Sequence, residues 1–365
     1  MNISILIPTK DRPDFILRIL KYYLSSNFSG KILIGDSSCD KLFSINDSNI
    51  VKYKANGLTI EHYHDVNLTA GKMSFFLANK VTTSYSLMVS DDDIFLTSCI
   101  SVCINFLENN ADYSAVHGKS LLIGIDKGDC MAFGRLTSLE EYPLATYESE
   151  MPMDRVEDFF KGNSNLNMSV IRSKINIDAF NEVNKFTDEM ETFIFGELIH
   201  ASIVSARGKI GEVSDYGLIR QWHNDQLYKT IDMVKWFSHV DWCDSYRILR
   251  STIEKEVVKF SNFKAKDIKN RTSLLLSNWV YTTISYLIVE KKQSFRSCLK
   301  TLIKPILGRL VFNVLVKFFK LFRKSMFNSV NKKVNAPHAN VERYIDLISD
   351  SRDSSDFFLK NLKQK

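Results

Sequence analysis

The stretch SLMVSDDDIF, residues 86–95, takes an apolar segment directly into three consecutive carboxylates. Its first half has the length and composition of a short buried β-strand. Ligands of βαβ sheets bind at the carboxyl ends of the strands, which is where Asp91, Asp92 and Asp93 fall. An acidic triplet alone favours a solvated turn or a helix N-cap, and Asp93 could cap a helix that begins near Thr97. The position after a buried strand favours a binding site instead.

The triplet also has the chemistry of a site for a hard divalent cation. Mg²⁺ and Mn²⁺ prefer oxygen ligands, and Mg²⁺ usually takes one or two carboxylates while phosphate oxygens and water complete its shell. Residues i and i+2 of an extended segment point to the same side, so we expect Asp91 and Asp93 to converge while Asp92 points away. The stretch therefore predicts a Mn²⁺ or Mg²⁺ ion that bridges a diphosphate.

The sequence around the triplet alternates strands with helices over residues 1–110. We expect strands at Ile3–Ile7, Lys31–Gly35, Thr59–His64 and Tyr85–Val89, and helices at Asp14–Ser25, Ala70–Val81 and Thr97–Asn109. This alternation is typical of βαβ units, so the predicted fold class is α/β, with a Rossmann-like, mostly parallel sheet. Polar clusters follow three of the strands, at residues 9–12, 36–38 and 91–93.

Beyond about residue 226 the pattern changes to long helical stretches with few glycines, Leu227–Phe260 and Arg271–Glu290. We therefore predict two regions, an α/β domain at residues 1–224 and a helical C-terminal region at residues 225–365. Residues 111–190 carry no motif that predicts a function.

The composition is that of a well-cored globular protein. Of the 365 residues 45% are hydrophobic and 25% are charged, which excludes a disordered or collagen-like chain. The six cysteines include no C-x-x-C pair, so we interpret them as reduced packing thiols of a cytosolic protein. The N-terminus lacks a basic segment before a long apolar run, and no stretch of about 18 uncharged apolar residues occurs. Both observations argue against a signal peptide or a spanning helix.

The formal charge of +6 is distributed unevenly along the chain. Residues 291–333 hold twelve of the 48 Lys and Arg and no acid, which leaves 36 bases against 42 acids elsewhere. Apolar residues recur in this basic segment at three- and four-residue steps, as in an amphipathic helix with a cationic face. Such a helix suits the headgroups of an anionic membrane; the alternative is a helix packed on the body with its charged face in water. Nucleic-acid binding is disfavoured because the segment has no known module.

Three runs together resemble the nucleotide-binding half of family-2 glycosyltransferases of the GT-A fold, in particular bacterial members found in surface-polysaccharide synthesis. They are ISILIPTKDRPDFILRIL at 3–20, KILIGDSS at 31–38 and SYSLMVSDDDIF at 84–95. The resemblance covers roughly residues 1–220. It implies an enzyme that moves a sugar, with inversion, from a nucleotide-sugar donor to a glycan or lipid-linked glycan acceptor.

The resemblance also implies which residues hold the nucleotide-sugar. Those matching the family's base- and ribose-binding loop and strand-end acid are Pro8, Thr9, Asp11, Arg12 and Asp36. Lys72 stands where family members carry polar residues near the donor phosphates.

The triplet resembles the D-x-D element of the family. Asp93 is then the first choice for the metal ligand, and Asp91 and Asp92 lie nearer the ribose or sugar. Extended geometry points to Asp91 and Asp93 as the metal ligands, so both lines of reasoning include Asp93. The match to D-x-D still leaves the register open by one residue, because the triplet has three acids.

A general base must take the proton of the acceptor hydroxyl. In the family an acidic pair opens an apolar helix, with a glycine eleven residues after the second acid, and Glu197 to Gly208 has that spacing. Gly196 stands where the first acid of the pair is expected, so the alternatives Asp188, Glu189 and Glu191 stay open. Glu197 is otherwise an ordinary first-turn carboxylate favoured by the helix dipole.

The segment DYGLIRQWHND at 215–225 places His223 after a strand-like run. A histidine after the last sheet element resembles the third metal ligand of many GT-A enzymes, and a neutral imidazole can join a carboxylate on the ion. A lone histidine is otherwise a surface or core residue. Arg220 and Trp222 beside it are candidates to contact phosphate and the sugar ring.

These patterns predict a metal-dependent glycosyltransferase that is cytoplasmic and peripheral on the inner face of the cell membrane. A sugar nucleotidyltransferase is the nearest enzymatic alternative, but its glycine-rich loop is absent after the first strand, where residues 8–13 contain no glycine. A non-catalytic, membrane-associated glycan-binding scaffold is the alternative from another class.

Overall fold

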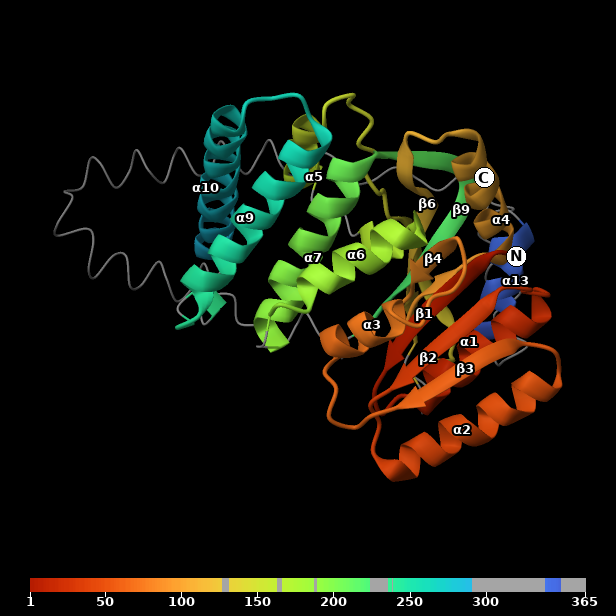
Figure 1. Cartoon of the computed structure of the whole chain (residues 1–365). Helices are drawn as coiled ribbons and strands as arrows, with labels where there is room; N and C mark the ends of the chain where they lie inside the picture. The colour runs from red at the N-terminus through yellow and green to blue at the C-terminus, as the bar shows by residue number, and fades with distance from the viewer. Residues whose placement is uncertain are drawn as a thin grey trace.

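The structure, a computed structural model, describes residues 1–126, 131–162, 166–186, 189–223, 236–237, 239–290 and 339–348. A nine-stranded sheet forms its centre, in the order β3-β2-β1-β4-β8-β6-β9-β5, with β7 paired to β6. Figure 1 shows this sheet with helices packed against it. The basic segment 291–333 and Asp188 lie outside the described residues.

The first half of the sheet is parallel, as predicted. Its strands are β1 (Ile3–Thr9), β2 (Lys31–Asp36), β3 (Thr59–His64) and β4 (Tyr85–Met88). Alternate residues of β1 enter different apolar clusters: Ile5 and Ile7 pack with α1 (Pro13–Ser25) and α2 (Asp40–Ala55), whereas Leu6 packs with α3 (Ala70–Ala78). Both faces of β1 are therefore covered by helices, which explains its continuous apolar composition.

The second half of the sheet is mixed. It contains β5 (Ile94–Phe95), β6 (Tyr113–Ile125), β7 (Leu136–Glu141), β8 (Val170–Arg172) and β9 (Lys209–Trp222). The long strands β6 and β9 run parallel, while β8 pairs antiparallel with β4 and β6, and β5 antiparallel with β9. The pairing of β9 with β5 brings the end of β9 beside the segment that follows the acidic triplet.

Two groups of helices flank β9 in the chain. Before it come α5 (Pro152–Gly162), the short η1 (Leu166–Met168), α6 (Ser173–Val183) and α7 (Glu189–Arg207). After it come α9 (Trp242–Phe260) and α10 (Ala265–Glu290). One apolar cluster joins the two groups, since Phe195 of α7, Leu249 of α9 and Leu276 of α10 all belong to it. The division at residue 224 stays a prediction, but the apolar packing crosses it. No helix in the described ranges is long and apolar enough to cross a membrane.

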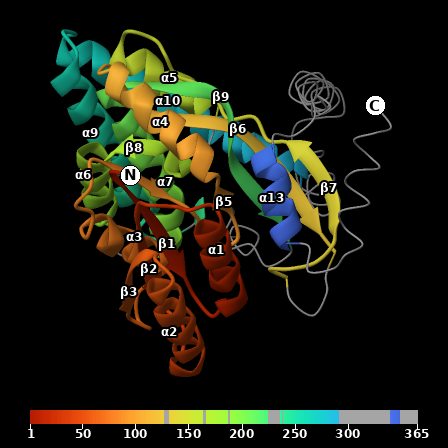
Figure 2. The same cartoon turned by 90° about the vertical axis from the view of Figure 1, so that its right-hand side faces the viewer.

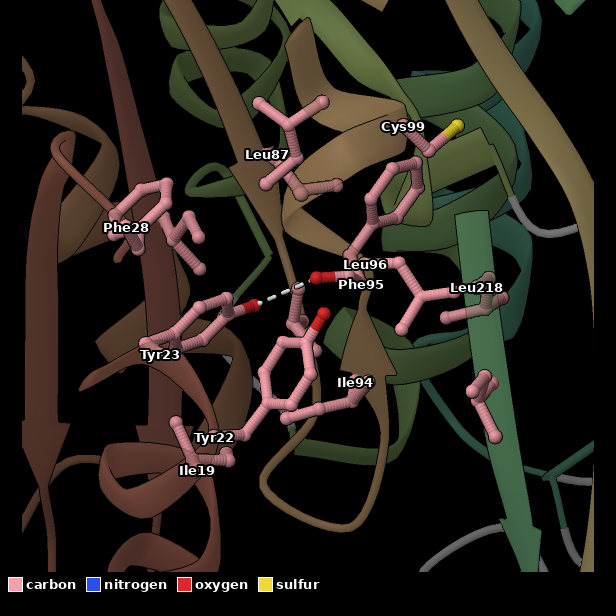
Figure 3. Close-up of a cluster of buried hydrophobic side chains, with 14 of the residues drawn as sticks. Ile19, Tyr22, Tyr23, Phe28, Leu87, Ile94, Phe95, Leu96, Cys99 and Leu218 are labelled. Atoms are coloured by element: carbon pink, nitrogen blue, oxygen red, sulfur yellow. Dashed lines mark hydrogen bonds between the residues drawn. The ribbon is translucent and has the colours of Figure 1, made fainter. Parts of the chain in front are cut away.

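The segment after the triplet is anchored in the largest apolar cluster (Figure 3). The hydroxyl of Tyr23 donates to the Phe95 carbonyl at 3.3 Å, and the Thr97 N–H, at the start of α4 (Thr97–Asn109), donates to the Tyr22 hydroxyl at 3.1 Å. Both tyrosines belong to α1. The acidic turn is thus held between β4, β5 and α1.

The C-terminal helix α13 (Ala339–Ile348) also packs on α1, far from α10 (Figures 1 and 2). Its apolar face is buried in the same cluster as the first strands, through Val341, Tyr344, Ile345 and Ile348. A helix more than 300 residues downstream of α1 in the chain therefore completes the covering of the N-terminal sheet.

Candidate active site

The acidic triplet forms a buried turn between β4 and β5. The Asp93 N–H donates to the Ser90 carbonyl at 3.1 Å, and the exposed fractions of Asp91, Asp92 and Asp93 are 5%, 8% and 1%. The solvated-turn alternative is therefore wrong. The cap alternative is wrong as well, because Leu96 is the N-cap of α4 and no side chain caps that helix. Three buried carboxylates at the carboxyl edge of a sheet must be compensated by nearby donors or cations.

Asp91 faces the loop after β1. One carboxylate oxygen accepts from the Thr9 hydroxyl at 2.7 Å and the other from Arg12 Nη1 at 2.9 Å. Burial and the charge of Asp92 raise the pKa of Asp91 to about 6, against the lowering effect of Arg12. Both oxygens already have protein donors, so Asp91 connects the triplet to the predicted nucleotide loop.

Asp92 faces His223, which directly follows β9. Their closest approach is 2.7 Å between Oδ2 and Nε2, and Arg12 Nη1 lies 3.3 Å from the same oxygen. Burial alone would raise the pKa of Asp92, but the hydrogen bond from His223 and the charge of Arg12 outweigh it and lower the pKa. The His223 ring also packs on Phe15, with centroids 5.7 Å apart. The structure thus brings His223 to the triplet, as predicted, through Asp92.

Asp93 faces β9. Its Oδ1 accepts from the Gln221 N–H at 3.0 Å. Oδ2 is buried and lies 3.4 Å from Arg220 Nε in an ion pair, but accepts no hydrogen bond within the described part of the chain. Burial and the charge of Asp92 raise the pKa of Asp93 to about 7. Asp91 and Asp93 do not converge: the expectation of extended geometry is wrong because the triplet is a turn, in which Asp91 and Asp92 share Arg12.

The turn has one oxygen that suits a metal ion. Among the described residues no three His, Cys, Asp or Glu side chains gather as a closed metal site. Mg²⁺, however, usually takes one or two protein carboxylates and completes its shell with substrate phosphates and water. Oδ2 of Asp93, which pairs with Arg220 but accepts no hydrogen bond from the described residues, fits that role. A divalent cation would offset the burial and the neighbouring negative charge that raise the pKa values of Asp91 and Asp93.

Arg18, which was not among the residues predicted from the sequence, donates a hydrogen bond to the backbone of the acidic turn. Its side chain is completely buried in α1; Nη2 donates to the Asp92 carbonyl at 2.7 Å, and Nη1 donates to the Ala132 carbonyl at 3.0 Å and to the Gln221 side-chain carbonyl. The guanidinium also lies 4.9 Å from the Phe15 ring centroid. The signal in the sequence was an arginine on the apolar face of a helix, where a charge needs buried partners.

Asp36 is fully buried at the end of β2 and already bound by its own chain. It accepts from the Ser38 N–H at 2.8 Å and from Asn46 Nδ2 at 2.7 Å, and His62 Nε2 lies 3.4 Å away. Burial alone would raise its pKa, but the hydrogen bonds from His62, Ser38 and Asn46 lower it to about 2. Asp36 therefore shapes the loop after β2.

The loops after β1 and β2 are tied together. The Asp11 N–H donates to the Ser38 hydroxyl at 2.7 Å, and the Asp11 carboxylate accepts from the Cys39 N–H at 3.0 Å. Asp11 has a positive φ of 56°, a conformation that aspartate adopts more readily than most residues. Pro8 and Gly35 pair just before these loops. The predicted nucleotide loop is thus positioned by two strands at once.

Lys72 is bound by the residues that follow α6. Its ammonium group donates to the Asn184 backbone and side-chain carbonyls, both at 3.0 Å, and to the Phe186 carbonyl at 2.5 Å. These acceptors surround the C-terminal end of α6, where a cation is stabilised by the helix dipole. The structure therefore gives Lys72 a capping role.

Glu197 is a solvent-accessible residue of α7 within electrostatic range of Arg220. Desolvation of its carboxyl group by the surrounding protein atoms raises the pKa of Glu197 to about 7, against the lowering effect of Arg220. Gly196 packs against Val183: an added Cβ would lie 2.9 Å from Val183 Cγ1, which explains why no acid stands there. Glu189 and Glu191 belong to the first turn of α7, but their side chains lie outside the description.

The comparisons with known proteins give one informative likeness. No protein-family model matches the chain, and no curated protein sequence matches it. Residues 1–349 of TarS from S. aureus, solved in complex with UDP-GlcNAc, superpose with a TM-score of 0.52 at 14% identity, covering 99% of this chain and 92% of that one. TarS is a glycosyltransferase with a GT-A-like fold. The chain has a GT-A-like fold.

Two further solved structures are similar at lower TM-scores. The longer TarS chain gives 0.44 at 14% identity, covering 72% of this chain, which spans 44% of that TarS chain. The mannosyltransferase PcManGT from Pyrobaculum calidifontis, in complex with GDP-Man and Mn²⁺, gives 0.44 at 10% identity, covering 95% and 85% of the two chains. The predicted fold is thus confirmed by the first superposition, while membership of family 2 stays a prediction.

Proposed function

We propose that the chain is a nucleotide-sugar-dependent glycosyltransferase that transfers a sugar to a glycan or lipid-linked glycan in surface-polysaccharide synthesis. The observation that carries the proposal is the buried acidic turn at the carboxyl edge of a GT-A-like sheet, bordered by three arginines and His223. That TarS was solved with UDP-GlcNAc supports a nucleotide-sugar as donor.

The arginines around the turn fit a diphosphate. The side chains of Arg12 and Arg220 are 25% and 20% exposed, so each pairs with the triplet while part of it stays open to a ligand. A guanidinium binds phosphate oxygens in bidentate geometry. We assign these two side chains to the donor diphosphate, with the Arg12 loop extending to the nucleoside.

Asp93 would hold a Mn²⁺ or Mg²⁺ ion, with His223 as a further candidate ligand beside Asp92. The ion, when bound, acts as a Lewis acid that stabilises the departing nucleoside diphosphate. Burial of the turn keeps water away from these charges, which strengthens every electrostatic interaction in the site. The identity of the ion is part of the proposal.

Glu197 is the proposed general base. A carboxylate with a pKa of about 7 is half ionised near neutral pH and holds the proton that it removes from the acceptor hydroxyl. Direct attack of that oxygen on the sugar gives a single displacement with inversion. Asp188, Glu189 and Glu191 remain the alternatives.

Replacement of Glu197 by Gln is expected to lower kcat by about 10²–10⁴-fold. In the wild type kcat/KM should rise with pH and level off above about pH 7, because the pKa of Glu197 is raised to about 7 and the base works only when ionised. The measurement is a pH–rate profile of donor turnover from pH 5 to 9. An unchanged profile in E197Q would transfer the role to one of the upstream acids.

The proposed function is tested by incubating the protein with a panel of nucleotide-sugars and Mn²⁺ and measuring release of the nucleoside diphosphate. Turnover of at least one donor, increased by a glycan acceptor, is the expected result. A nucleotidyltransferase would instead release pyrophosphate from a nucleoside triphosphate and a sugar phosphate. A scaffold would turn over neither set of substrates.

We also propose that the basic segment 291–333 binds an anionic membrane from the cytoplasmic side, which places the site near a lipid-linked acceptor. Twelve bases without an acid support this, since each Lys or Arg near an anionic surface contributes about 1 kcal/mol. A deletion of the C-terminus is a poor test, because it would also remove α13.

Substitution of Lys317, Lys320 and Lys324 by Gln in the full chain is expected to weaken binding to anionic vesicles about 100-fold. The matched control replaces Lys41, Lys52 and Lys54, three exposed lysines of α2, by Gln. Flotation with vesicles containing phosphatidylserine measures the binding. Equal loss of flotation in the two triple variants would argue against a specific membrane segment.

A further inference from the structure

Through Tyr344, helix α13 reaches Arg18, which donates to the acidic turn. The Tyr344 ring meets the Tyr22 ring edge-on with centroids 5.5 Å apart, and Arg18 Cζ lies 5.9 Å from the Tyr344 centroid. At the end of the helix, the Ile348 carbonyl accepts from the Gly134 N–H at 3.0 Å. The helix therefore touches both α1 and the segment that carries Ala132, another partner of Arg18.

Arg18 lies between two rings and the turn. Phe15 and Tyr344 are both within 6 Å of its guanidinium, while three carbonyl oxygens accept from Nη1 and Nη2. The Asp92 carbonyl is one of these acceptors, so the orientation of Arg18 fixes the backbone at the middle of the triplet. A buried guanidinium over an aromatic face gains a favourable cation–π interaction.

We infer that α13 is a component of the acidic site and that Tyr344 positions Arg18, and through Arg18 the turn that carries Asp92 and Asp93. Tyr344 is a positioning residue, because it acts on the turn through the Arg18 guanidinium that its ring faces. The aromatic ring carries the effect. The Tyr344 hydroxyl is buried and has no hydrogen-bond partner among the described residues, so we expect Phe at this position to keep the effect of the ring.

A matched set of substitutions in the full chain separates positioning from packing. Tyr344→Phe keeps the ring, and Tyr344→Leu keeps an apolar side chain but removes the ring. Ile348→Ala loosens the same helix at a buried position about one turn after Tyr344 and keeps the backbone carbonyl that accepts from Gly134. Hydrogen–deuterium exchange of the amides of residues 90–96 reports the order of the turn and needs no substrate.

Tyr344→Leu is expected to speed exchange in residues 90–96 by about tenfold, whereas Tyr344→Phe should match the wild type. Ile348→Ala should speed exchange in α13 and leave the turn protected. Equal protection of the turn in the Leu and Phe variants would overturn the inference. So would equal loss of protection in Tyr344→Leu and Ile348→Ala, because the turn would then respond to packing of α13 in general.

The second measurement rests on the proposed function. With a nucleotide-sugar as substrate, kcat/KM is expected to stay near the wild-type value in Tyr344→Phe and Ile348→Ala. In Tyr344→Leu it should be about tenfold lower. Absence of turnover in the wild type would contradict the glycosyltransferase proposal, while the exchange comparison would still decide the role of Tyr344.

Discussion

Replacement of Asp93 by Asn is expected to lower donor turnover by about 10²–10³-fold. The substitution removes the negative charge from Asp93 Oδ2, a buried oxygen that accepts no hydrogen bond from the described residues, and with it the proposed ligand of the divalent cation. The fold should survive, since burial and Asp92 already disfavour the charged form of Asp93 and raise its pKa to about 7. Release of nucleoside diphosphate under saturating Mn²⁺ measures the effect.

A matched control for this variant is Asp244→Asn. Asp244 is an exposed carboxylate in the first turn of α9, paired with Arg247, and its loss should leave turnover within about twofold of the wild type. Turnover in D93N equal to that in D244N would contradict the assignment of Asp93.

Replacement of Arg18 by Lys is expected to lower the free energy of unfolding by about 2–4 kcal/mol. A lysine has a single terminal nitrogen and cannot reach the Asp92, Ala132 and Gln221 carbonyl oxygens at the same time, so buried acceptors lose their donors. Urea unfolding followed by fluorescence or circular dichroism measures the change.

Arg247→Lys is the corresponding surface substitution, since the Arg247 side chain is largely exposed and pairs with Asp244 within one helical turn. Its expected effect is less than about 0.5 kcal/mol. A similar small change in R18K would show that Arg18 is not the centre of the network beneath the acidic turn.

The sequence predicted the parallel half of the fold because local patterns determine it. The strands at Ile3–Thr9, Lys31–Asp36 and Thr59–His64 are short apolar or half-buried runs ended by polar residues, and the structure keeps them within two residues of the predicted bounds. Helix α2 was missed, because its weakly amphipathic sequence of polar and charged residues buries only Asn46, Ile50 and Tyr53. The long pair β6 and β9 depends on contacts across about 95 residues, which no local pattern reveals.

The site was predicted in part. Asp91, Asp92, Asp93 and His223 come together as expected, because they follow strands that end at one edge of the sheet. Their relative orientation was wrong, since a turn and not an extended strand carries the triplet. Asp36 is hydrogen-bonded to side chains of α2 and β3, and Lys72 to residues at the end of α6. A single sequence does not show that these elements lie together.

Arg18 and Tyr344 show why the remainder could not be predicted. In the sequence Arg18 is a charge on the apolar face of a helix and Tyr344 an ordinary member of one, but neither pattern names its partners. Their meeting depends on how α13 returns to α1. The same packing brings Ala132 and Gln221 to the guanidinium. Residues that position a buried charge therefore come from parts of the chain that only the tertiary structure connects.

The most direct test of the central claim is calorimetric titration of nucleoside diphosphates into the wild type and D93N, each with and without Mn²⁺. At least one nucleoside diphosphate should bind the wild type about tenfold or more tightly when Mn²⁺ is present, and D93N should lose this gain. Identical binding by the two proteins with Mn²⁺, or no binding of any nucleoside diphosphate to the wild type, would contradict the proposal that the acidic turn is a metal-assisted nucleotide-sugar site.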